Sequence, residues 1–76
     1  MKELLTYIAQ NLVDHPAQVS VQEYQRDGET TLELRVASED MGKVIGRQGR
    51  IAKWIRVLMR SVGQHRGVRV SVEISD

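Results

Sequence analysis

The sequence contains no cysteine, which excludes disulfide bonds and thiolate metal sites. No apolar run approaches the roughly 20 residues that a membrane-spanning helix needs. The N-terminal segment Met1–Leu5 has an acid near its start and no cleavage-like site, so it does not resemble a signal peptide. We therefore expect a cytoplasmic protein with no membrane segment. The length of 76 residues allows one domain, assigned here to residues 1–76.

Residue patterns typical of enzymes are also missing. The sequence has no cluster of metal ligands, no carboxylate pair in a pocket-like pattern and no P-loop. His15 stands beside the only proline and His65 stands alone in a polar connection, so neither has a partner for catalysis. We expect no catalytic activity, no catalytic residue, no metal site and no cofactor.

Acidic residues are absent from residues 41–72, although the net charge of the whole chain is only +1. This segment holds eight lysines and arginines, whereas residues 1–40 hold three cations against eight acids. A block of one sign indicates a surface for a polyanion. The alternative is a solvated helix face, but such faces usually mix the two signs.

Hydrophobic periodicity predicts three helices and three strands in the order α-β-β-α-α-β. Asp27-Gly28 is a strong hairpin signal between the first two strands. Tyr24 breaks the alternation of the first strand, which a bulge or an early strand end would explain. The predicted helices are Lys2–Val13, Glu39–Ile45 and Arg50–Val62, and the predicted strands are Val19–Gln25, Thr30–Val36 and Val68–Ile74.

The longest predicted helix separates apolar from basic residues. Its predicted sheet-facing stripe is Ile51, Ile55, Leu58 and Val62, and its predicted water-facing stripe is Lys53, Arg56 and Arg60. Trp54 lies between the two stripes, where we expect it at the core edge or in a dimer contact. Gly63 is predicted to cap this helix, and Ser38 is predicted to cap the preceding one.

The turn between the last two helices is the segment on which a functional reading depends. Residues 44–51 read Val-Ile-Gly-Arg-Gln-Gly-Arg-Ile, with Gly46 and Gly49 around two polar residues. Glycine tolerates positive φ and leaves room for an anion near the backbone. The following helix directs unpaired N–H groups and its positive dipole end toward the turn. A bare G-x-x-G is a weak motif, but this apolar-flanked version between two helices is more specific.

This segment resembles the GXXG loop of the KH domain, an RNA- and single-stranded-DNA-binding module that holds about four nucleotides. The element order is similar to that of the type II KH domain, so the resemblance covers nearly the whole chain. It implies an α+β fold with three helices on one face of a three-stranded mixed sheet. Among single-domain KH proteins the chain most resembles the small bacterial KhpA family of RNA-binding proteins.

The resemblance implies single-stranded RNA as the ligand and a set of contact residues. Gly46 and Gly49 would admit the RNA backbone, and bases would lie in an apolar groove. We favour a groove position for Ile45 and a core position for Ile51, while Val44 and Val36 are candidates for either. The implied RNA-binding residues are Gly46, Arg47, Gln48, Gly49, Lys43, Ile45, Arg50 and Lys53.

The resemblance also implies a biological setting. Members of the KhpA family look like cytoplasmic RNA chaperones that act with a larger KH-containing partner and are linked to cell elongation and cell-wall synthesis. It further implies a heterodimer with that partner or a homodimer, with Tyr7 or Trp54 as interface candidates. Two other readings remain open: an interaction module whose basic helix binds an acidic protein, and a ribosome-assembly factor. The sequence leaves the choice between RNA and single-stranded DNA open.

Overall fold

The computed structural model describes residues 1–76 and confirms the predicted α-β-β-α-α-β order. Three short 3-10 turns, which the sequence pattern did not indicate, join some of the elements at Pro16–Gln18, Ser38–Asp40 and Arg47–Gly49. The helices are α1 (Lys2–Leu12), α2 (Met41–Ile45) and α3 (Arg50–His65), and the strands are β1 (Ser20–Arg26), β2 (Glu29–Arg35) and β3 (Arg69–Ser75).

The three strands form one mixed sheet in the order β1-β2-β3. β1 pairs with β2 antiparallel through the Asp27-Gly28 turn, where both residues have positive φ, of 51° and 77°. β3 pairs with β2 in parallel. Tyr24 lies opposite Thr31 in an unbroken register, so both a bulge and an early strand end were wrong. Its side chain lies half-exposed, away from the buried Val21.

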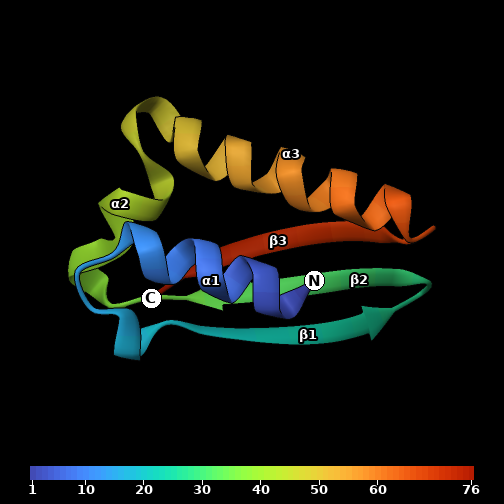
Figure 1. The fold of residues 1–76 in the computed structure, drawn as a ribbon, viewed down its shortest axis with the longest axis horizontal. Coiled ribbons are helices and arrows are strands. Elements are labelled where there is room, and N and C mark those ends of the chain that lie inside the picture. Colours follow the sequence, from blue (N-terminus) through green and yellow to red (C-terminus); the bar gives the residue numbers. More distant parts are fainter.

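All three helices cover one face of the sheet and leave the other face open (Figure 1). Because side chains alternate along a strand, each strand sends every second residue toward the helices. The covered face therefore collects the apolar side chains, and the open face carries a mixture of polar and charged ones. The buried hydrophobic cluster comprises Leu5, Ala9, Val21, Leu32, Leu34, Val36, Val44, Ile55, Met59, Val70 and Val72.

The orientation of α3 differs from the prediction. Its fully buried positions are Ala52, Ile55, Met59 and Gly63, whereas Leu58 is only partly buried. The buried stripe is therefore turned by roughly 75° from the predicted one. Small residues decide this orientation, because a Cβ at Gly63 would lie 2.5 Å from Val70 Cγ2 and 2.8 Å from the Val68 carbonyl oxygen. Gly63 is thus a packing residue inside α3 and not its cap.

This rotation also changes the surroundings of the basic residues on α3. Arg56 lies beside the sheet, and its Nε donates a hydrogen bond of 3.2 Å to the Val72 carbonyl oxygen of β3. The face of α3 farthest from the sheet instead carries Trp54 and Val57, both about half exposed. Trp54 is therefore not a core-edge residue. The predicted opposition of apolar and basic stripes was wrong, because the basic stripe borders the edge strand.

The start of α2 is held by Asp40 and not by a serine cap. Ser38 makes no side-chain capping bond, so its predicted role was wrong. Asp40 is 1% exposed, and its two carboxylate oxygens accept hydrogen bonds from the backbone N–H groups of Asp14 (3.1 Å) and His15 (3.0 Å). One buried side chain therefore ties the end of α1 to the helix that precedes the glycine turn.

Replacing Asp40 with asparagine is expected to lower the free energy of unfolding by about 1 kcal/mol, the value of one hydrogen bond. Asparagine keeps the shape of the side chain but has one acceptor oxygen for the two N–H groups. Chemical denaturation would measure the difference. Glu39→Gln is the control, because that carboxylate is exposed. Equal stability of Asp40→Asn and the wild type would contradict this role of Asp40.

Candidate nucleic-acid interface

The glycine turn joins α2 to α3 and lies at one end of the molecule (Figure 1). Three residues with positive φ shape its backbone: Gly46 (φ 78°, ψ 173°), Gln48 (φ 58°) and Gly49 (φ 73°). The Gly46 N–H donates to the Gly42 carbonyl oxygen and the Gly49 N–H donates to the Gly46 carbonyl oxygen. The backbone is therefore fixed, while the side chains of Arg47 and Gln48 are exposed at its tip.

Gly46 and Gly49 have different structural roles. A Cβ at Gly46 would lie 2.6 Å from Ile51 Cγ1 and 2.9 Å from the Ile51 backbone nitrogen, so the turn folds back onto the first residues of α3. A Cβ at Gly49 would meet no atom within 4 Å. Gly46 therefore serves the fold, and Gly49 leaves open space beside the helix terminus. A Cβ at Gly42 would likewise meet no atom within 4 Å, so no other backbone of the chain approaches this glycine closely.

The N-terminus of α3 faces this turn without a side-chain cap. The Arg50 N–H donates to the Arg47 carbonyl oxygen, which leaves the next backbone donors of the first turn without a capping side chain. Such donors, together with the positive end of the helix dipole, form an anion site. The helix has 16 residues, so its dipole is fully developed at this end.

The cations around the turn are almost entirely unpaired. Of the eight lysines and arginines between residues 41 and 72, only Lys43 has a carboxylate within 4.0 Å. Arg47 and Lys53 are exposed and make no side-chain hydrogen bond, and Arg50 Nη2 makes only a long 3.5 Å contact with Gln48 Oε1. The resulting surface is positive.

Lys43, one of the predicted contact residues, is paired with a carboxylate. Its Nζ lies 3.0 Å from Asp14 Oδ2, in the connection that follows α1. The hydrogen bond to Asp14 raises the pKa of the Lys43 ammonium. Because both side chains are largely exposed, this ion pair contributes little stability. The pairing links residues 29 positions apart, which no local sequence pattern indicates.

The four apolar groove candidates separate into two groups. Val36 and Val44 are buried in the core and are not available to a ligand. Ile51 packs against the core from its edge, as we expected. Ile45 is partly exposed and lies outside the core cluster, so it is the candidate that remains beside the turn.

The structure shows two further properties of the molecule as a whole. No group of three histidine, cysteine, aspartate or glutamate side chains lies close enough together to hold a metal ion. None of the helices combines the length and the apolar character needed to cross a membrane.

Comparison with known proteins gives one consistent family. Residues 2–74 match the family model described as the KhpA/KhpB KH domain. The chain is 49% identical over 76 residues to the RNA-binding protein KhpA of Chlamydia pneumoniae, covering all of this chain and 97% of that one. It is 53% identical over 74 residues to the RNA-binding protein KhpA of Clostridium acetobutylicum, covering 97% of this chain and 99% of that one.

A solved structure supports the fold independently. A crystal structure of an Era variant from Aquifex aeolicus bound to GDP and AlF4− matches 97% of this chain and 29% of that chain, with a TM-score of 0.67 and 20% identity. At that identity the match bears on the fold alone. The layered α+β arrangement and the family match together confirm the predicted type II KH fold. The chain therefore belongs to the KhpA/KhpB family of KH-domain proteins.

Proposed function

We propose that this protein binds single-stranded RNA and that the turn 46–49 holds the RNA backbone. One observation carries the proposal: an exposed G-x-x-G turn opens onto the uncapped N-terminus of α3, within a segment, residues 41–72, that holds eight cations and no acid. The relatives from Chlamydia pneumoniae and Clostridium acetobutylicum are named RNA-binding proteins, which supports the same reading.

The residues of the turn have different roles in the proposed binding. Gly49 admits a phosphate to the backbone donors of α3, and Gly46 keeps the turn folded over Ile51. Arg47 and Gln48 contact phosphates or riboses from the tip of the loop. A KH domain of this kind holds about four nucleotides.

The residues flanking the loop complete the proposed site. Arg50 and Lys53 continue the positive surface along α3, and Ile45 offers an apolar contact to a base. Lys43 forms the other wall when it leaves Asp14, an exchange that costs little because the pair is exposed.

The biological setting proposed for this activity follows the family resemblance. The protein acts as a cytoplasmic RNA chaperone together with a larger KH-containing partner, in control of cell elongation and cell-wall synthesis. The exposed Trp54 and Val57 on α3 and Tyr7 on α1 support a protein partner or a second copy of the chain, because three large apolar side chains stand in water. A basic helix bound to an acidic protein is the competing reading.

Salt dependence of RNA binding tests the proposal. If two to four phosphates are neutralised, the logarithm of the binding constant should fall with the logarithm of salt concentration with a slope of about −1.4 to −2.8. Fluorescence anisotropy of a labelled single-stranded RNA would measure this slope, with duplex RNA and single-stranded DNA as competitors. A binding constant independent of salt, or a duplex that competes as well as the single strand, would reject the proposed mode.

A further inference from the structure

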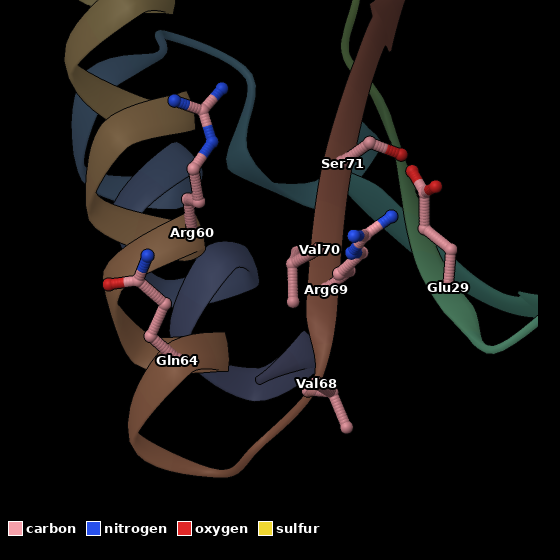
Figure 2. A pocket seen from close by; sticks show the side chains of 7 residues that line it. All are labelled: Glu29, Arg60, Gln64, Val68, Arg69, Val70 and Ser71. Atoms are coloured by element: carbon pink, nitrogen blue, oxygen red, sulfur yellow. The ribbon is translucent and has the colours of Figure 1, made fainter.

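A second basic surface lies at the far end of α3 from the glycine turn. A hollow of about 420 Å³ lies at the start of the edge strand β3, beside the C-terminal half of α3. Figure 2 shows Arg60 and Gln64 on the α3 wall, Arg69 and Ser71 on β3, and Glu29 on the neighbouring strand β2.

The polar groups of this hollow suit an anion. Arg60 and Arg69 have no carboxylate within 4.0 Å, and neither they nor Gln64 makes a side-chain hydrogen bond. A guanidinium offers a fork of N–H donors that matches phosphate geometry. Arg60 and Gln64 lie on the α3 side of β3, whereas Arg69 lies on the side that faces Glu29, so the donors flank this edge strand (Figure 2). Ser71 already shares its hydroxyl with Thr31 at 3.2 Å, so the two arginines and the amide are the available donors. Glu29 is the one opposing charge among the lining residues.

The hollow and the glycine turn are joined by a continuous row of cations. Lys53, Arg56 and Arg60 recur at intervals of three and four residues, which places them on one flank of α3, and Arg50 lies at the start of the helix beside the glycine turn. Arg56 marks where this flank meets the sheet, because it bonds the Val72 carbonyl oxygen on the edge strand β3. β3 runs back beneath α3, from the hollow toward the turn (Figure 1).

We propose that the Arg60–Arg69 hollow binds a backbone phosphate of the same RNA strand, beyond the nucleotides held at the glycine turn. Ten residues of helix separate Arg50 from Arg60, a span of about 15 Å. A strand that follows the row of cations therefore needs more than the roughly four nucleotides that fill a KH groove. The site recognises phosphate and not base identity. This inference rests on the proposed RNA binding at the turn.

An RNA with an abasic extension tests whether the Arg60–Arg69 hollow binds phosphate. A single-stranded tetranucleotide is extended at its 5′ or its 3′ end by about four abasic nucleotides, which keep the phosphates but cannot occupy the base groove. We expect the tail at one end only to raise affinity about tenfold, and to make the salt slope steeper by about 0.7 for each added phosphate contact. The double variant Arg60→Glu/Arg69→Glu should remove that gain and leave affinity for the bare tetranucleotide within about twofold. Glu29→Gln should increase the gain.

The control variant is Arg26→Glu/Arg66→Glu, which makes the same change in net charge with two exposed arginines outside the hollow. It should keep most of the gain from the tail. Equal gains from both tails, no gain from either, or equal loss in both double variants would overturn the second site while leaving binding at the turn intact. If the wild type binds neither the tetranucleotide nor the tailed RNAs, the proposed function itself fails. Circular dichroism of every variant separates these results from unfolding.

Discussion

Replacing Arg47 and Gln48 with aspartate is expected to weaken single-stranded RNA binding by at least about 100-fold without unfolding the protein. A lost hydrogen bond to a charged group costs about 1.5–3 kcal/mol, and about 1.4 kcal/mol corresponds to a tenfold change in affinity. The two new carboxylates also repel the phosphates. Both side chains are exposed, and aspartate tolerates the left-handed conformation that position 48 adopts with φ 58°.

The chain offers a matched control for this variant. Gln25 and Arg26 are the same two residue types at the end of β1, exposed, beside the hairpin at the opposite end of the sheet from the glycine turn (Figure 1). Gln25→Asp/Arg26→Asp therefore changes the net charge equally at a distant place. Anisotropy titrations of both variants should show the large loss only for the turn. An equal loss would assign the effect to overall charge, and no loss would reject the clamp.

The second large effect concerns stability: replacing glycine with alanine should change the free energy of unfolding in opposite directions at two positions. Gly63→Ala is expected to lower the free energy of unfolding by about 3 kcal/mol, at the upper end of overpacking costs. The added methyl would meet Val70 Cγ2 at 2.5 Å and the Val68 carbonyl oxygen at 2.8 Å, and the carbonyl belongs to backbone that has little room to move. The backbone at Val68 is held in place, because the Val68 N–H donates a hydrogen bond to the Gly63 carbonyl oxygen.

Gly42→Ala is the matched comparison. Gly42 lies in α2, is exposed, and a Cβ there would meet nothing within 4 Å. Alanine should raise the free energy of unfolding by up to about 1 kcal/mol, because it favours the helix over glycine by that amount. Urea denaturation of both variants would measure the two effects. Two stabilising substitutions would show that helix propensity alone governs these positions and that α3 does not pack tightly on β3.

Features that depend on local chemistry could be predicted from the sequence. The Asp27-Gly28 turn follows from the positive φ that both residues tolerate, and the glycine turn follows from its spacing between two apolar flanks. The fold itself was predicted from the resemblance of the element order and of the glycine turn to the type II KH domain. The exposure of Arg47 and Gln48 at the loop tip agrees with the same reading.

Features that depend on packing could not be predicted in this way. The phase of α3 was assigned from its branched aliphatic residues, but Ala52 and Gly63 face the sheet because small residues allow close approach. The Lys43–Asp14 contact and the bonds of Asp40 join segments that only the folded chain brings together. Tyr24 interrupts an apolar alternation because its side of β1 faces water.

Arg56 has a further consequence, because β3 forms an open edge of the sheet. Edge strands offer unpaired backbone groups to strands of other molecules, and proteins commonly protect them with charged side chains. The bond from Arg56 to the Val72 carbonyl oxygen occupies one acceptor on this edge and fixes a positive charge there. The edge therefore discourages sheet-to-sheet aggregation between copies of the chain, while the same charge leaves it attractive to an anionic polymer.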